Sequence, residues 1–174
     1  RDSSRNWAAF QTGLTVNLDQ FLPWKPLFRI EWTHLTPYIY VHRSKVNTFE
    51  HYGAPLGHWI GPNGEGLFFS LEGRPKDQIW VQAYTTLSKR GEVDEESLNS
   101  QYRHEKVSFL YRTYEGEAEQ RTLFGIRGEW SFTSWARVRF DFFSSDWSQY
   151  LATDSATRSD MQKVDATLQI IIGL

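Results

Sequence analysis

The sequence predicts an all-β protein, an antiparallel up-and-down β-barrel that spans a membrane. Three observations support this. Side chains alternate between apolar and polar in seven segments, helical spacing of apolar residues is almost absent, and the connections between segments are short at one end and long at the other. Because successive side chains of a strand point to opposite faces, each segment has one apolar and one polar face.

The first two predicted strands are residues 6–18 and 27–42. On the first, one face has Ala8, Phe10, Leu14, Val16 and Leu18. On the second, one face has Phe28, Ile30, Trp32, Tyr38 and Tyr40. His34 also falls on the apolar face of the second strand and interrupts its pattern.

Four further strands follow as two pairs, residues 67–74 with 78–87 and residues 121–130 with 135–142. The apolar face of the first pair has Leu67, Phe69, Leu71, Ile79, Val81, Ala83 and Leu87. That of the second pair has Phe124, Ile126, Trp130, Ala136, Val138, Phe140 and Phe142. The last strand, residues 163–174, alternates up to the final residue, with Val164, Ala166, Leu168, Ile170, Ile172 and Leu174 on one face.

The connections differ sharply in length. Residues 19–26, 74–77 and 132–134 are predicted hairpin turns, whereas residues 43–65, 89–120 and 145–162 are far longer than a usual hairpin loop. Short turns on one rim and long loops on the other are typical of outer-membrane barrels. The strand pattern and the loop lengths are independent signals, and they agree.

Composition excludes several other classes. The net charge of -2 argues against a nucleic-acid partner, which a basic patch would indicate. The chain has no cysteine, so disulfides and thiolate metal sites are excluded. It has no run of 18 apolar residues, which excludes a transmembrane helix, and residues 1–7 do not resemble the core of a signal peptide.

Lipid outside and water inside is favoured over the reverse arrangement, a soluble calyx around a small apolar ligand. Aromatic residues concentrate near strand ends, as in interfacial belts: Phe21, Trp24, Trp32, Tyr38, Tyr40, Trp130 and Trp135. The polar face mixes both charge signs, as a hydrated lumen would. The predicted lumen-lining residues are Arg29, Glu31, Glu72, Arg74, Arg127, Glu129, Arg137, Arg139 and Asp141.

Strand direction adds a statement about completeness. If the last strand ends in the periplasm, seven antiparallel strands place the start of the first on the extracellular side, whereas a bacterial barrel begins in the periplasm with an even strand number. Either the sequence contains an eighth strand that alternation does not reveal, or several chains together close one barrel, or residues 1–174 are the C-terminal part of a larger barrel. We favour the last alternative and expect a single-domain segment of a barrel in the bacterial outer membrane.

Residues 37–75 carry the pattern HYG.PLGH..GPN, formed by His51, Tyr52, Gly53, Pro55, Leu56, Gly57, His58, Gly61, Pro62 and Asn63. This stretch resembles the C-terminal barrel region of the Wzi-type capsule-assembly family. The resemblance implies a large monomeric outer-membrane barrel that binds surface (capsular) polysaccharide and helps to anchor the capsule, without catalysis. The rest of the chain resembles this family only in being composed of alternating strands, without a shared motif.

The loop with this pattern is the predicted glycan-binding site. Sugars are bound by aromatic faces against their C–H surfaces and by polar side chains that hydrogen-bond their hydroxyls. The predicted ligands in this loop are His51, Tyr52, His58, Trp59, Asn63 and Glu65. The alternative reading is that Tyr52 and Trp59 only pack the loop against the barrel.

Metal and catalytic sites are not predicted, and no cofactor is expected. His42, Glu50, His51 and His58 lie close in sequence without the short spacings of a zinc site. Serines and a histidine are available without a motif that pairs them: Ser88, Ser108, Ser144, Ser145 and His34. The carboxylate pairs Glu31 with Glu129 and Glu72 with Asp141 alternate with arginines, which favours ion pairing over acid–base catalysis.

Two functions remain open for a barrel that contacts outer-membrane lipid and is not an enzyme. One is binding or anchoring of surface polysaccharide. The other is a general diffusion porin with a charged lumen, which would conduct ions. The soluble calyx is the third possibility.

Overall fold

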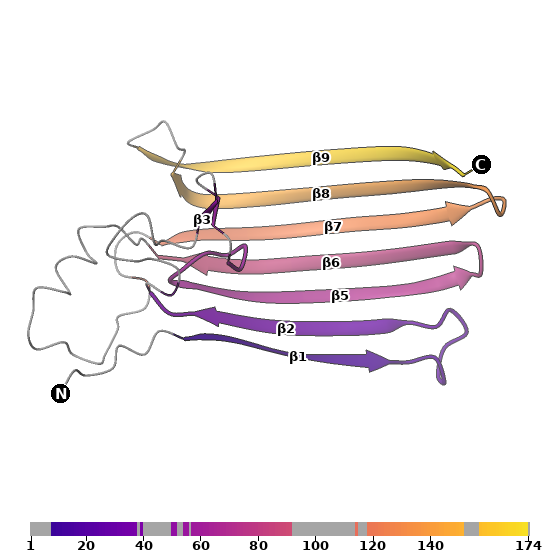
Figure 1. Ribbon diagram of the computed structural model, residues 1–174, viewed down its shortest axis with the longest axis horizontal. Helices are drawn as coiled ribbons and strands as arrows, with labels where there is room; N and C mark the ends of the chain where they lie inside the picture. The colour runs from indigo at the N-terminus through magenta and orange to yellow at the C-terminus, as the bar shows by residue number, and fades with distance from the viewer. Residues whose placement is uncertain are drawn as a thin grey trace, which may run out of the picture.

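The computed structural model describes residues 8–37, 39, 50–51, 54–55, 57–91, 114, 118–151 and 157–173. Seven strands form one antiparallel sheet in the order β1-β2-β5-β6-β7-β8-β9 (Figure 1). They are β1 (Ala9–Asn17), β2 (Leu27–Leu35), β5 (Gly64–Lys76), β6 (Ile79–Arg90), β7 (Glu119–Ser131), β8 (Ala136–Leu151) and β9 (Arg158–Ile172). The described residues contain no helix, so the predicted all-β, up-and-down arrangement of seven strands is confirmed.

The sheet is a single open layer. β1 and β9 each pair with one neighbour only, and the short pair β3 (Glu50–His51) and β4 (Ala54–Pro55) is separate from the sheet. Figure 1 shows the β1–β2, β5–β6 and β7–β8 turns at one end, which we call the turn rim. The opposite ends of these strands form the other rim, which we call the loop rim.

β2 is shorter than the predicted strand over residues 27–42. It ends at Leu35, and Pro37 follows in a turn. Proline has no N–H to donate and disfavours helical backbone in the residue before it, so a chain can turn here although apolar residues continue. Tyr38 and Tyr40, predicted on the apolar face, lie outside the described residues.

The prediction of a long loop over residues 145–162 is wrong. β8 continues to Leu151 and β9 starts at Arg158, and pairing persists through Trp147 and Met161 and, beyond an irregularity, to Tyr150 and Ser159. Alternation missed this extension because polar side chains occupy both faces of it: Ser144, Ser145, Asp146 and Ser148. The strand continues there through backbone hydrogen bonds, which do not depend on an apolar face.

β5 is also longer than the predicted strand over residues 67–74. It extends from Gly64 to Lys76, with an irregularity in the register between Gly73 and Lys76. The turn predicted at residues 74–77 is therefore shorter and lies at Asp77 and Gln78. The register irregularity accounts for the difference, because it adds residues to the strand without lengthening its partner β6 by the same number.

One face of the sheet, the apolar face, has almost no cover. It exposes thirteen large apolar side chains: Phe10, Leu14, Leu71, Leu87, Phe124, Ile126, Trp130, Phe140, Phe142, Val164, Leu168, Ile170 and Ile172. The buried hydrophobic residues of the described chain are only Leu35, Ile60 and Ala136. A soluble domain normally buries most such side chains between two layers, and here the described residues provide one layer.

The apolar residues form a band that is inclined to the strands. A register row crosses all seven strands through Leu14, Ile30, Phe69, Thr85, Phe124, Ser144 and Val164. Toward the loop rim, the band ends at this row on β9, at Val164, but continues to Phe10 at the start of β1. Toward the turn rim, it continues to Ile172 on β9 but only to Leu18 just after β1. Both edges shift by about four residues across the sheet, an inclination on the order of 25°.

Glycines on the sheet are covered by aromatic rings. A Cβ at Gly128 would lie 2.4 Å from the ring of Phe140 on the neighbouring strand, and a Cβ at Gly73 would lie 2.3 Å from the ring of Trp24. These rings occupy the space of the missing side chains. Larger residues at these positions would force the rings away from the sheet.

Candidate functional site

The segment 57–63 folds over the opposite, polar face at the loop rim. The side chain of Ile60 is buried, and Cβ atoms at Gly64 and Gly66 of β5 would lie 2.2 and 2.4 Å from it. A turn fixes the segment, because Gly61 has a positive φ of 81° and its N–H donates to the carbonyl of His58 at 2.9 Å. The absence of side chains at these two glycines of β5 therefore leaves the space in which Ile60 packs.

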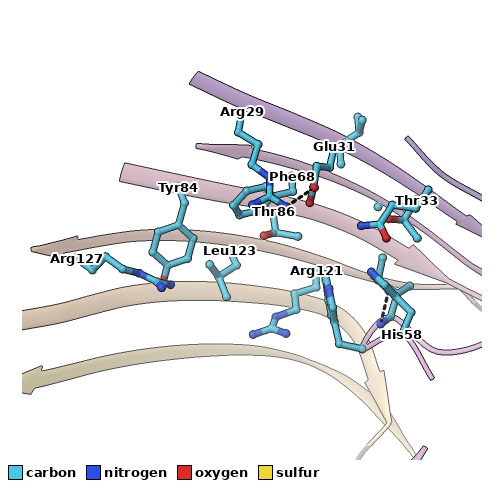
Figure 2. Close-up of a pocket in the computed structure, with 15 residues that line it drawn as sticks. Arg29, Glu31, Thr33, His58, Phe68, Tyr84, Thr86, Arg121, Leu123 and Arg127 are labelled. Carbon is cyan, nitrogen blue, oxygen red and sulfur yellow. Dashed lines mark hydrogen bonds and ion pairs between the residues drawn. The ribbon is translucent and has the colours of Figure 1, made fainter. Parts of the chain in front are cut away.

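A pocket of about 360 Å³ lies between the segment and the sheet. Figure 2 shows side chains of β2, β5, β6 and β7 pointing into it, with His58 at the end near the segment. Its polar and aromatic lining includes Arg29, Glu31, His58, Trp59, Tyr84, Arg121 and Arg127. This mixture of aromatic rings and charged groups is chemically suited to a polar ligand.

At one end of the pocket, Tyr84 spans β7 and reaches β8. A Cβ at Gly125 would lie 2.3 Å from Tyr84 Cζ, so the ring covers this glycine. The Tyr84 hydroxyl donates to Asp141 Oδ1 at 3.4 Å, and Arg127 Cζ lies 4.4 Å from the ring centroid. Arg127 Nε and Asp141 Oδ2 are 3.8 Å apart, an ion pair beyond hydrogen-bond distance.

At the other end, Arg121 lies near two tryptophans. Its Cζ is 4.4 Å from the ring centroid of Trp147 on β8 and 5.9 Å from that of Trp59. Arg121 also lines a second, smaller pocket of about 110 Å³, together with Arg90, Glu119 and Trp147 among others. Among the described carboxylates, none forms an ion pair with Arg121, whereas Glu119 pairs with Arg90 at 3.3 Å.

Eight of the nine predicted lumen-lining residues lie on the polar face in register. They are Arg29, Glu31, Glu72, Arg127, Glu129, Arg137, Arg139 and Asp141. Arg74 lies beyond the last regular pair of β5 and donates to the Asp77 carbonyl in the turn at 3.4 Å.

The charges of the polar face are largely paired with one another. Arg29 pairs with Glu31, and Glu129 receives Arg139 at 2.9 Å and Arg137 at 3.4 Å. Gln82 donates to Glu72 at 2.8 Å. The two predicted carboxylate pairs are therefore engaged by arginines, a tyrosine and an amide, and do not form acid–base pairs with each other.

The six predicted glycan ligands are not brought together. His58 and Trp59 line the pocket, and Trp59 is 54% exposed. Tyr52 and the side chain of His51 lie outside the described residues. Asn63 and Glu65 differ from the prediction: Asn63 is 2% exposed, and Glu65 is on the apolar face, opposite to the pocket. The strand was predicted to start at residue 67, but β5 starts at Gly64. Glu65 is therefore part of the strand, and alternation points its side chain away from the pocket.

Asn63 joins the connection between β2 and β5 to the connection between β6 and β7. Its N–H donates to the Thr36 carbonyl at 3.2 Å, its carbonyl accepts from Gly91 N–H at 2.9 Å, and its Oδ1 accepts from Tyr114 N–H at 2.9 Å. A positive φ of 56° allows this geometry, and asparagine tolerates it better than most residues. The buried side chain is a connector of loops.

Glu65 is the centre of a polar cluster on the apolar face at the loop rim. Its carboxylate accepts from Trp32 Nε1 at 2.7 Å and from the Tyr114 hydroxyl. Burial and the hydrogen bond to Glu65 raise the pKa of Tyr114 above its ordinary value. His34, directly opposite Glu65 on β2, stacks on Trp32 at 5.9 Å, which explains its place on the apolar face.

Neither a metal site nor a nucleophile with its base is assembled within the described residues. No three His, Asp or Glu side chains there lie close enough to hold a metal ion. His42 and Ser108 lie outside the described part. Ser145 is 1% exposed and accepts a hydrogen bond from Trp147 Nε1 at 3.2 Å, so it is occupied.

Sequence reasoning missed Tyr84, Arg121, Trp147 and Tyr114 as site residues. Tyr84 and Arg121 are on the polar parity of their strands, and this parity could have indicated them. Trp147 fell in a stretch that was read as a loop. Tyr114 has no local signal, because its contacts come from Asn63, from Glu65 on β5 and from Lys89 on β6.

Comparison with known protein families, with curated proteins and with solved structures finds no match to this chain. No helix within the described residues has the length and hydrophobicity to cross a membrane. The site is therefore interpreted from its own geometry.

Proposed function

We propose that the chain is part of a bacterial outer-membrane β-barrel whose polar face, beneath the segment 57–63, binds surface polysaccharide. The observation that carries the membrane assignment is the apolar face, with thirteen exposed large apolar side chains on one continuous surface. Leaving one such side chain in water forgoes about 1.5–3 kcal/mol of burial free energy. Soluble monomers rarely expose a patch of this kind, and lipid would cover it.

The geometry of the band also supports lipid. On β9 it extends over nine residues, from Val164 to Ile172, which agrees with the roughly 9–11 residues that a tilted strand needs to cross a bilayer. The band is inclined to the strands, as tilted barrel strands in a flat membrane require, by less than their typical tilt of about 35–45°. Exposed aromatic residues at the turn rim, Phe21, Trp130, Phe132 and Trp135, fit an interfacial belt.

The pocket supports polysaccharide binding over free diffusion. The segment 57–63 occupies the polar face where an open channel would need space, and it presents the exposed ring of Trp59 beside Arg121 and His58. Such a ring can stack on the C–H surface of a sugar while charged groups bind its polar substituents. The resemblance of residues 37–75 to capsule-assembly proteins agrees with this interpretation.

The lipid assignment is tested with single-cysteine variants of the native protein in vesicles. The chain has no cysteine, so each variant has one labelling site. A fluorophore at Phe124→Cys or Ile126→Cys should be quenched by brominated phospholipid, whereas one at Leu123→Cys, adjacent but on the polar face, should not. Equal, weak quenching at all three sites would exclude lipid contact and favour a soluble calyx.

The glycan assignment is tested by retention of surface polysaccharide from the source bacterium on the native protein in detergent. Trp59→Ala should lower retention at least tenfold. Trp135→Ala is the matched control, because Trp135 is 58% exposed, similar to Trp59, but lies at the turn rim. Unchanged retention in both variants would reject this segment as the glycan site.

A diffusion porin with a charged lumen is the second candidate. The specific observation in its favour is the set of ion pairs on the polar face, which would suit a hydrated wall. If the protein is a porin, it should conduct ions in planar bilayers. The wild type should then retain polysaccharide only at background level, and Trp59→Ala should not change that level. Conductance without retention would select this candidate.

A further inference from the structure

Arg121 has no ion-pair partner among the described carboxylates. The larger pocket is lined by three arginines, of which Arg29 pairs with Glu31 and Arg127 pairs with Asp141. In the smaller pocket, Glu119 pairs with Arg90. Arg121 lines both pockets without a described carboxylate within ion-pair distance, and Glu119, whose charge acts on it, is already paired with Arg90.

The guanidinium of Arg121 also has an unused donor. Its Nε is buried and has no hydrogen-bond partner among the described residues. A buried donor without a partner is unfavourable, so a group that accepts a hydrogen bond from this Nε would be favoured there. The charge and the donor thus indicate the same kind of occupant, an anion.

Two tryptophans lie beside the guanidinium. Trp147 lies 4.4 Å and Trp59 5.9 Å from Arg121 Cζ, within the range of a cation–π contact. A guanidinium can also form two parallel hydrogen bonds to a carboxylate or phosphate. Trp59 is 54% exposed and offers the rest of its ring to a sugar.

We infer that the site formed by Arg121, Trp59 and Trp147 binds an anionic sugar of the polysaccharide, with Arg121 on its carboxylate or phosphate group and Trp59 on its ring. This inference rests on the proposed glycan function and adds the charge of the ligand. The site only binds its ligand, and no bond is made or broken. It selects a sugar that has both a negative charge for Arg121 and a ring that can stack on Trp59.

The probes are trigalacturonate, its fully methyl-esterified form, which has the same rings without charge, and inorganic phosphate. Binding to the native protein in detergent is measured by calorimetry. Wild type should bind the acid at least tenfold more tightly than the ester, and the difference should shrink as salt screens the charges. Phosphate that competes with the acid would support the same anion site, and phosphate that binds when the acid does not would assign the ligand to phosphorylated sugars.

Arg121→Gln should remove the preference for the acid, and Arg121→Lys should retain part of it. Arg139→Gln, on the same face but paired with Glu129 near the turn rim, should keep the full preference. Heat-dependent mobility on gels shows whether each variant is folded. Wild type that binds acid and ester equally, or that binds none of the probes while still retaining polysaccharide, would overturn the inference and leave the proposed function standing. A wild-type protein that does not retain polysaccharide at all would overturn the proposed function.

Discussion

Ile60 occupies the space of a missing side chain at Gly66: a Cβ there would lie 2.4 Å from Ile60 Cδ1. The contact holds the segment 57–63 against the polar face, and through it the position of Trp59 in the pocket. A residue on the sheet that has no side chain thus determines where an exposed ring of the loop lies.

Gly66→Ala should therefore displace the segment while the sheet remains intact. Overpacking of a fitted contact typically costs about 1–3 kcal/mol. Hydrogen exchange of a peptide that covers residues 57–63 should become faster in this variant. Gly173→Ala is the control, because a Cβ there would meet only the Trp135 carbonyl at 3.8 Å. Unchanged exchange in Gly66→Ala would mean that Ile60 does not anchor the segment.

The contact of Tyr84 with Gly125 makes a second prediction, on the stability of the sheet. A Cβ at Gly125 would lie 2.3 Å from the Tyr84 ring, so Gly125→Ala should lower the free energy of unfolding by about 1–3 kcal/mol. Tyr84→Phe keeps the ring and loses only a 3.4 Å hydrogen bond to Asp141, so it should cost less. Urea unfolding in lipid vesicles measures both, and equal costs would contradict the packing role of the ring.

A charge on the apolar face tests the lipid contact energetically. Ile126 is at the middle of the band on β7, where an arginine in a membrane barrel costs about 2–4 kcal/mol. Ile126→Arg should show this cost in urea unfolding from vesicles. Leu123→Arg, on the polar face of the same strand, should cost less than Ile126→Arg. The reverse order would indicate that the polar face is the one that meets lipid.

Docking of the segment should depend on pH through His58. Burial lowers the pKa of His58 below its ordinary value of 6.5, although Glu31 nearby opposes the shift. The ring is therefore neutral when docked, and its Nδ1 accepts from Ile60 N–H at 3.4 Å. Below pH 6.5 the undocked state binds more protons than the docked state, so docking weakens as pH falls.

Hydrogen exchange of residues 57–63 should thus show less protection at pH 5.0 than at pH 7.5, after correction for the intrinsic rate. His58→Gln cannot gain this proton, so its protection should change little between the two pH values. If protection depends on pH equally in the wild type and in His58→Gln, a titrating group other than His58 causes the pH dependence.

The ion pairs near the turn rim should contribute little to stability. Glu129 receives two arginines whose side chains are about half exposed, with side-chain exposures of 50% for Arg139 and 49% for Arg137. Exposed pairs are typically worth 0.2–1 kcal/mol, and salt screens them. A double-mutant cycle of Glu129→Gln and Arg139→Gln should give a coupling in this range. A coupling well above it would mean that this part of the polar face is shielded from water.

Much of the sheet could be predicted because strand alternation is a local pattern. Phe124 and Ile126 were assigned to one face and Arg127 to the other from β7 alone, and the structure agrees. The ends of strands were less predictable. The extension of β8 to Leu151 depends on pairing with β9, and no alternation of its own side chains indicates it.

The site was predicted only in part, for a similar reason. His58 and Trp59 were recognised from the composition of their loop, but Asn63 and Glu65 were grouped with them because they are near in sequence. The start of β5 at Gly64 separates them, since one step along a strand moves a side chain to the other face.

The sequence by itself determined which residues alternate, and hence that the chain forms antiparallel strands with one apolar and one polar face. That information is local, because each side chain follows from the parity of its own strand. Only the tertiary structure decided that Arg121 lies close to both Trp59 and Trp147, and that Tyr114 reaches Glu65. Such contacts join residues far apart in the chain, and the register of several strands and the path of the loops must be set before they can form.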